Sequence, residues 1–116
     1  MVSNRITLSK SKIREVIEKI KGTADNDFRF LYRIEEPNKD PYSFFQELEI
    51  NYKDAVNIIK SLTIEDYKYA QYDIKNKFEY MYIFYKQISS KIAYIKIGFK
   101  SDKTVVISFH EKMFEN

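Results

Sequence analysis

Two neighbouring stretches near the C-terminus alternate between apolar and polar positions. Residues 91–99 and 104–110 follow the two-residue period of a half-buried strand and are rich in β-branched and aromatic residues. The four polar residues between them, 100–103, can close a hairpin, although they lack the Asn-Gly or Asp-Gly of the tightest turns. The pattern predicts a hairpin that ends on His110, the only histidine of the chain. We expect the rest of the chain to support the surface that this hairpin displays.

Three earlier stretches also carry a strand pattern. Residues 28–34 alternate strictly, and residues 67–73 and 79–88 are rich in aromatic side chains. The pair Ser89-Ser90 is a suitable hairpin link before the C-terminal hairpin. These stretches therefore extend the hairpin into an antiparallel sheet.

Apolar residues at helical spacing mark three helices earlier in the chain. They are a helix capped by Ser9 or Ser11 that runs to about Lys21, a short helix over 42–48, and a helix over 53–62 that Asn51 can cap. Residues 1–8 are expected to be a loose lead-in, and residues 35–41, which hold both prolines, a loop.

The order of these elements predicts the fold class. Helices first and a meander of strands afterwards indicate an α+β fold, with N-terminal helices packed on an antiparallel sheet. A chain of 116 residues is long enough for one domain with a single modest core, so we expect one domain over 1–116.

Tyrosine and phenylalanine are unusually frequent. The chain has ten Tyr, nine Phe and no Trp. Most of these rings are expected to pack in the sheet, but tyrosine is amphipathic, and a surplus can also provide a surface that stacks on bases or packs on a partner.

Charge and cysteine content narrow the classes of function. A net charge of +3 permits contact with an anionic partner without requiring one. The absence of cysteine excludes a disulfide scaffold, thiolate zinc sites and a cysteine nucleophile. The sequence has no leading apolar segment like a signal peptide and no run of 18 apolar residues, so we expect a cytoplasmic protein without a membrane partner.

His110 is the first candidate for chemistry. It ends a predicted strand and shares the alternate face of Val106 and Ser108, where the sheet gives way to a polar tail. Histidine titrates near neutrality and can exchange a proton at physiological pH. A lone histidine is more often structural than catalytic, so both interpretations stay open. No second histidine and no cysteine supports a metal site, and we expect no cofactor.

Tyr94 and Lys96 are the second candidates. Alternation places both on one face of their strand, next to the strand that ends in His110. An ammonium can offset charge on a phosphorane, an imidazole can move a proton, and a phenol can orient a base or phosphate, so the three together suit phosphodiester chemistry. The alternative is that Tyr94 packs and Lys96 is a solvated charge.

Two further sets suit contacts with RNA. The run Tyr67-Lys68-Tyr69 interleaves basic and aromatic residues, a pattern that can follow a single-stranded backbone and stack its bases. Arg29 and Arg33 share a face of the early strand and can bind phosphate in a bidentate manner. Ordinary solvent-facing strands show the same patterns.

Three motifs in order resemble MqsR-type toxins. The run 48–67 resembles the central helix and following turn of these toxins, and residues 93–97 and 106–110 resemble their last two strands. The ending Ser-Phe-His is similar to the branch of the family found in Firmicutes and their mobile elements. The resemblance covers roughly residues 28–112.

The resemblance implies a RelE-like α+β fold and a metal-independent ribonuclease that cuts mRNA and is silenced by a cognate antitoxin protein. By position, Tyr94 matches the family's active-site tyrosine, and His110 occupies the place of a catalytic lysine or histidine. The family's lysine after the Asp-aromatic pair falls on Lys68 or on Tyr69. The family's glutamine on the long strand falls near Met81. This is a departure from the family, because methionine cannot make the polar interactions of a glutamine.

Two hypotheses about function follow. The first is an mRNA interferase in which the ribose 2′-hydroxyl attacks the adjacent phosphate, leaving a 2′,3′-cyclic phosphate and a 5′-hydroxyl. His110 is the general acid or base, Lys68 and Lys96 stabilise charge, and Tyr94 positions the substrate. The partners of such a protein are mRNA and an antitoxin protein. It would form a homodimer or a toxin–antitoxin heterocomplex. The second is a non-catalytic interaction protein on the same scaffold, either an inhibitor encoded by a mobile element or a nucleic-acid-binding regulator.

Overall fold

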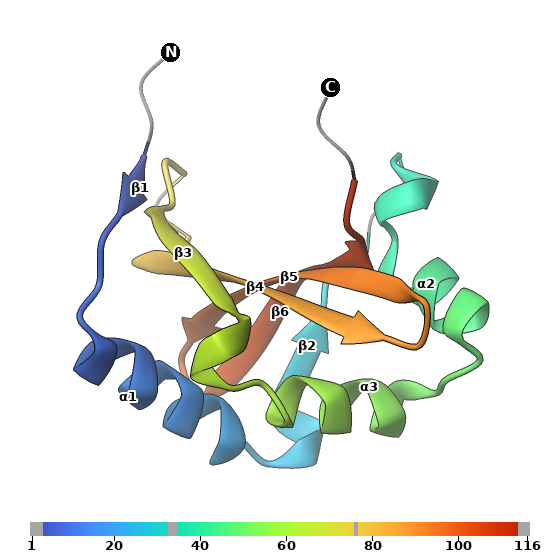
Figure 1. The fold of residues 1–116 in the computed structure, drawn as a ribbon, viewed down its shortest axis with the longest axis horizontal. Helices are drawn as coiled ribbons and strands as arrows, with labels where there is room; N and C mark the ends of the chain where they lie inside the picture. The colour runs from blue at the N-terminus through green and yellow to red at the C-terminus, as the bar shows by residue number, and fades with distance from the viewer. Residues whose placement is uncertain (1–3, 33–34, 76, 114–116) are drawn as a thin grey trace.

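A single twisted sheet runs through the molecule, and helices pack on one of its faces (Figure 1). The computed structural model describes residues 4–32, 35–75 and 77–113. Within these residues it has a mixed α+β fold with a six-stranded sheet and three α-helices. In spatial order the strands are β1 (Arg5–Ile6), β3 (Tyr67–Tyr72), β4 (Tyr80–Ile88), β5 (Lys91–Lys100), β6 (Lys103–Glu111) and β2 (Phe28–Phe30).

The three helices lie close to where the sequence pattern predicts them. They are α1 (Lys10–Lys21), α2 (Pro41–Leu48) and α3 (Tyr52–Lys60). Ser9 caps α1 by accepting a hydrogen bond from the Lys12 amide, and Asn51 and Asp54 form a capping box at the start of α3. Short 3-10 turns precede β2, α2 and β3: η1 (Asp25–Asp27), η2 (Pro37–Lys39) and η3 (Ile64–Asp66).

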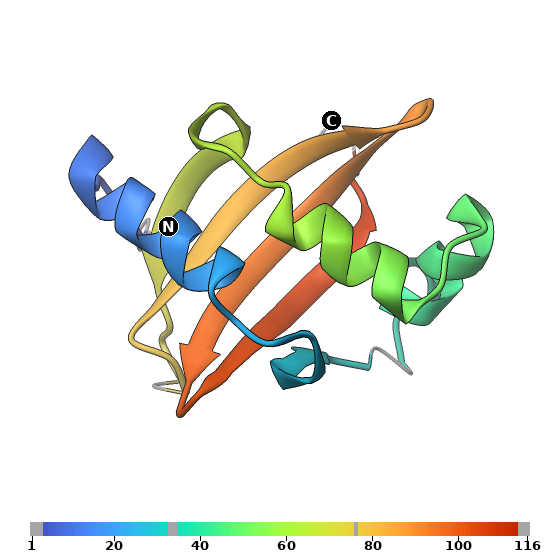
Figure 2. The same ribbon diagram turned by 90° about the horizontal axis from the view of Figure 1, so that it is seen from below.

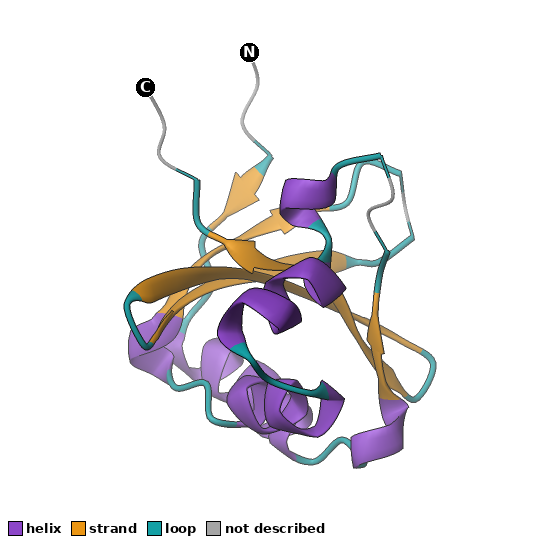
Figure 3. Cartoon of the chain, turned by 90° about the vertical axis from the view of Figure 1, so that its right-hand side faces the viewer, coloured by secondary structure: helices purple, strands orange, loops and turns teal. Residues whose placement is uncertain are grey.

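Seen from below, α1 and α3 lie across the same face of the sheet (Figure 2). The helix α2 flanks the edge near β6, on the side that Figure 3 faces. The core lies between these helices and the sheet, and phenylalanine rings fill much of it. Phe30 meets Phe45 and Phe109 edge to face, with ring centroids 5.2 Å and 5.8 Å apart. The face opposite α1 and α3 is thus left for the side chains that alternate away from the core.

The start of the chain corrects one expectation. Within the stretch expected to be a loose lead-in, Arg5 and Ile6 form the edge strand β1, antiparallel to β3. The side-chain amide of Asn4 donates to the Tyr72 carbonyl at 2.8 Å, and the Arg5 guanidinium lies 3.8 Å from the centroid of the Tyr69 ring. A strand of two residues is too short to show a period of two, so the hydrophobic pattern could not reveal it.

The arrangement of β2 corrects a second expectation. The sheet is not wholly antiparallel, because β2 pairs in parallel with β6 at the far edge. The helices also do not all precede the strands, since α2 and α3 follow β2 in the chain. The strand ends at Phe30, although the amide of Leu31 still donates to the Val106 carbonyl at 3.1 Å. The predicted continuation over 33–34 lies outside the described residues. Alternation identifies a strand's faces, but not its neighbour or its direction.

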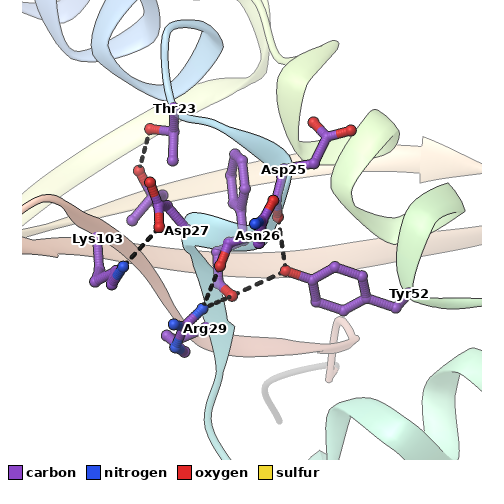
Figure 4. A network of polar contacts seen from close by, with 9 residues as sticks. Thr23, Asp25, Asn26, Asp27, Arg29, Tyr52 and Lys103 are labelled. Atoms are coloured by element: carbon purple, nitrogen blue, oxygen red, sulfur yellow. Dashed lines mark hydrogen bonds and ion pairs between the residues drawn. The ribbon is translucent and has the colours of Figure 1, made fainter.

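A polar network fixes β2 to the rest of the sheet (Figure 4). The hydroxyl groups of Thr23 and Thr104 lie 2.6 Å apart, and the Lys103 ammonium is 2.6 Å from the Asp27 carboxylate. From α3, the Tyr52 hydroxyl lies 2.8 Å from the carbonyl oxygen of Asp25 and 2.9 Å from that of Phe28, the first residue of β2. These contacts join α1, β2, α3 and the start of β6, so a strand of only three residues has a defined position.

The β4–β5 turn and the β5–β6 turn each contain a serine whose backbone is in the left-handed conformation. Ser89 and Ser101 have φ angles of 56° and 55°. The sequence marks both turns by their polar residues, but neither has the glycine that reaches this region most easily. The Ser89-Ser90 link is where the sequence predicts it.

Gly98 leaves room for a neighbouring ring. A Cβ atom at position 98 would lie 2.6 Å from Cδ1 of Phe78 and 3.1 Å from Cδ1 of Ile107. The first distance is one that real Cβ contacts essentially never show, so the Phe78 ring can lie against β5 in this position only because residue 98 has no side chain.

We expect Gly98→Ala to lower the free energy of unfolding by about 1–3 kcal/mol, because the methyl group overpacks the face of the sheet. Urea denaturation measures this change. The control is Gly22→Ala at the end of α1, where φ is −80° and the nearest atom to an added Cβ is the Glu18 carbonyl oxygen at 3.3 Å. It should change stability by less than about 1 kcal/mol. Equal stability of Gly98→Ala and the wild type would contradict the close contact.

Candidate active site

Cross-strand pairing brings the predicted residues of the C-terminal hairpin together. Tyr94 of β5 lies between Tyr85 of β4 and His110 of β6, and Lys96 pairs with Ser108 in the next row on the same face. Ala93 and Ile95, which alternate with Tyr94 and Lys96 along β5, belong to the core. Tyr94, Lys96 and His110 therefore point to the face of the sheet opposite the core, as the alternation of β5 predicts.

A bulge in β6 corrects the predicted face of Val106. Lys96 pairs with Ser108 but Ile97 pairs with Val106, so Ile107 is an extra residue on β6. An extra residue reverses the alternation, which places Val106 in the core and His110 on the opposite face. The expectation that Val106 and His110 share a face was wrong, because it assumed an uninterrupted period of two.

These side chains line an open cavity of about 330 Å³. It lies over β3 to β6 and is bounded by η2 and by the residues that follow β6. The lining residues are Lys39, Tyr69, Tyr85, Tyr94, Lys96, Ser108, His110, Lys112 and Met113. The site is therefore assembled from five separate segments of the chain around the C-terminal hairpin.

His110 and Tyr94 form the base of the cavity as a stacked pair. Their ring centroids are 5.1 Å apart and their planes differ by 14°. The Tyr85 ring stands next to Tyr94, with centroids 6.0 Å apart. His110 is only 6% exposed, so its imidazole reaches solvent chiefly through the cavity. The stack limits rotation of both rings and fixes the position of the imidazole.

A main-chain contact assigns the proton on the His110 ring. Nδ1 of His110 lies 2.8 Å from the carbonyl oxygen of Glu111. A carbonyl oxygen only accepts, so Nδ1 carries the hydrogen and donates. In the neutral ring Nε2 then has the lone pair, and it can take a proton from a substrate or, once protonated, return one.

The lining of the cavity is positively charged. It includes Lys39, Lys96 and Lys112, and none of the described residues that line it is a carboxylate. The Lys96 ammonium lies 6.0 Å from the centroid of the Tyr94 ring, so one of these cations is directly at the stacked pair. Lys39 also forms an ion pair of 3.0 Å with Glu36, outside the lining. Cations in a concave, partly desolvated site attract anions such as phosphate.

The phenol of Tyr94 is held in its neutral form. Burial raises the pKa of Tyr94 well above its usual range, and the neighbouring Tyr69, by its charge when ionised and by a hydrogen bond between the hydroxyls, raises it further. Arg5 lowers the pKa, but less than these effects raise it. At physiological pH Tyr94 is therefore a hydrogen-bond donor and not a phenolate.

Tyr69 enters the site, whereas Tyr67 does not. Tyr69 pairs with Ile83 and Tyr67 with Phe84, so a bulge at Lys68 separates them and turns them to opposite faces of the sheet. The Tyr67 ring packs on Phe84 with centroids 5.7 Å apart, and burial raises the pKa of its phenol. The predicted base contact at Tyr67 is therefore placed in the core.

The remaining predicted residues lie apart from the cavity. Lys68 does not line the cavity, although its ammonium lies 5.6 Å from the centroid of the Tyr85 ring. Arg29 is exposed on β2, and its guanidinium donates to the carbonyls of Asn26 and Phe28 at 2.6 Å and 3.0 Å (Figure 4). Arg33 lies outside the described residues. The structure thus brings together His110, Tyr94, Lys96 and Tyr69.

Sequence reasoning missed several residues of the site. Tyr85 could have been found from the pairing of the predicted strands, which sets it beside Tyr94. Lys39 and Lys112 carry no signal, because they lie outside the strands and reach the cavity only through the tertiary fold. Among the described residues, no three His, Asp or Glu side chains gather closely enough to hold a metal ion. None of the helices in the described part of the chain is both long and apolar enough to cross a membrane.

Tyr94 should make stability depend on pH. Its raised pKa means that the folded protein keeps the phenolic proton above pH of about 10, where the unfolded chain releases it, so stability falls as pH rises. Between pH of about 9 and about 11, we expect the free energy of unfolding of the wild type to fall by about 1 kcal/mol more than that of Tyr94→Phe. Urea denaturation at each pH measures both changes. The control Tyr72→Phe, at an exposed ring, should keep the wild-type dependence. An identical pH dependence in Tyr94→Phe would contradict the assignment.

Comparisons with known proteins do not assign this chain to a family. No protein-family model, no curated protein and no solved structure matches the chain. The function is therefore argued from the side chains of the cavity.

Proposed function

We propose that the protein is a metal-independent endoribonuclease toxin with a RelE-like fold, similar to MqsR-type toxins and held inactive by a cognate antitoxin protein. The observation that carries this proposal is the stacked Tyr94–His110 pair at the base of a cavity lined by lysines. An imidazole with a defined proton, a neutral phenol and an ammonium then face the same space.

The reaction that suits these groups is transfer within the RNA strand. The ribose 2′-oxygen attacks the adjacent phosphorus, the bond from phosphorus to the 5′-oxygen breaks, and a 2′,3′-cyclic phosphate and a 5′-hydroxyl result. Nε2 of His110 carries one of the two proton transfers: the neutral ring takes the proton of the 2′-hydroxyl, or the protonated ring gives a proton to the 5′-oxygen. RNA supplies its own nucleophile, so the protein needs to provide only proton transfer, charge and position.

The other residues stabilise charge and position the strand. Lys96 and Lys112 offset the negative charge that develops on the phosphate oxygens, and the Tyr94 hydroxyl donates a hydrogen bond to one of them in place of its bond to Tyr69. Tyr69 and Tyr85 present rings on which a base can stack. Single-stranded RNA is the substrate class that uses both the cations and the rings.

We expect His110→Gln to lower the rate of RNA cleavage by about 10²–10⁴-fold, because glutamine can form hydrogen bonds but cannot transfer a proton. Purified protein is incubated with labelled single-stranded RNA in the presence of EDTA, and the ends of the products are analysed. The wild type should leave a 2′,3′-cyclic phosphate and a 5′-hydroxyl with chelator present. Wild-type rates in His110→Gln would remove the histidine from the mechanism.

The control variant is Lys53→Gln, an exposed lysine on α3, which should cleave at the wild-type rate. Thermal unfolding of each variant shows whether it is folded. Lys96→Gln gives a second test, with an expected loss of about 10²-fold, because one stabilising cation is removed without touching the buried histidine. Binding of RNA without cleavage by the wild type would instead support the non-catalytic interaction protein.

A further inference from the structure

A second cavity adjoins the candidate active site. It has a volume of about 360 Å³ and shares Tyr85 and Lys112 with the first. Its other lining residues are Lys68, Gln87, Ser90, Ile92 and Glu111. No role in the proposed reaction uses these five residues, although the cavity they form is as large as the one that holds His110.

Tyr85 lines both cavities, and two ammonium groups lie close to its ring. The ammonium groups of Lys68 and Lys112 lie 5.6 Å and 5.3 Å from the centroid of its ring. Only Lys112 also lines the cavity that holds His110. A ligand that places one anionic group beside His110 and extends past Tyr85 into the second cavity would therefore meet a further ammonium, that of Lys68.

The rest of the second cavity suits a nucleobase. Ile92 is 45% exposed and offers an apolar surface beside the Tyr85 ring. The side-chain amide of Gln87 has two N–H donors and an acceptor oxygen, and its nitrogen donates to the Ser89 carbonyl over a long distance of 3.3 Å. Bases bind proteins by packing a face on such surfaces and pairing an edge with such groups.

The one carboxylate that lines this cavity has a cationic partner. Glu111 forms an ion pair of 3.2 Å with Lys91, which also lies 3.7 Å from Glu47, so the charge of Glu111 is partly offset and opposes an incoming phosphate less than an isolated carboxylate would. The cavity thus has cations at Lys68 and Lys112, an apolar surface at Ile92 and a polar group at Gln87. A nucleotide, with its phosphate and its base, needs the same kinds of groups.

We propose that this second cavity is a subsite for the neighbouring nucleotide of a single-stranded RNA, in which Lys68 binds a phosphate next to the reacting one. The inference rests on the proposed function, because it extends the substrate from the cavity that holds His110. Lys68 then binds the strand away from the reacting atoms, and the protein prefers RNA that is long enough to occupy both cavities.

The test measures binding to RNA that cannot be cleaved. A 2′-O-methyl heptauridylate has no 2′-hydroxyl nucleophile, so wild-type protein can be titrated with it by fluorescence anisotropy over a range of salt concentrations. We expect Lys68→Gln to weaken binding about fivefold and to reduce the slope of log affinity against log salt by about 0.7, the value for one lost phosphate contact on a single strand. Lys53→Gln carries the same charge change and should alter neither quantity.

Length dependence separates a subsite from a general loss of charge. In competition with the labelled heptamer, a 2′-O-methyl dinucleotide should lose far less affinity for Lys68→Gln than the heptamer does, because it has a single phosphate. An equal loss for both lengths, a Lys68→Gln protein that behaves like Lys53→Gln, or no binding of the heptamer would each overturn the subsite. If ordinary RNA is not cleaved but the heptamer shows the predicted loss, the subsite stands and the nuclease proposal fails.

Discussion

The extra residue that β6 inserts opposite β5 decides which side chains share the candidate active site. With Ile107 bulged, Val106 stays in the core while Ser108 and His110 turn to the opposite face. Without the bulge, a strand with Val106 inward would bury His110 among the helices. A second bulge, at Lys68, has the same effect on β3 and brings Tyr69 instead of Tyr67 to the cavity. The cationic cavity therefore depends on two local breaks in strand pairing.

The surplus of aromatic residues is divided between the two faces of the sheet. Phe30, Phe84 and Phe109 fill the space under the helices together with tyrosine rings such as Tyr82. Tyr85 and Tyr94 line the cavity on the other face, where a hydroxyl can meet water or a ligand. Tyrosine therefore contributes both to the packing that stabilises the fold and to the groups that the cavity offers for binding.

Much of the fold follows from local patterns, while the site depends on contacts that local patterns do not contain. Asn51 caps a helix and Ser89-Ser90 joins two strands because both effects act over a few residues. The parallel pairing of β2 with β6 joins residues 76 positions apart, and no periodicity encodes it. Tyr94 and His110 could be placed together because a hairpin pairs them, whereas Lys39 reaches them only after the helices have packed.

The acceptor that orients His110 is a main-chain oxygen. Many histidines are oriented by a carboxylate, which a single substitution removes and whose charge also favours the imidazolium form. Here the acceptor is the carbonyl of residue 111, and all twenty amino acids carry that group. Drift in sequence at position 111 therefore leaves the tautomer intact, and only a displacement of the end of β6 would disturb it. The course of the backbone, and not the identity of a neighbouring side chain, therefore sets the orientation of the ring.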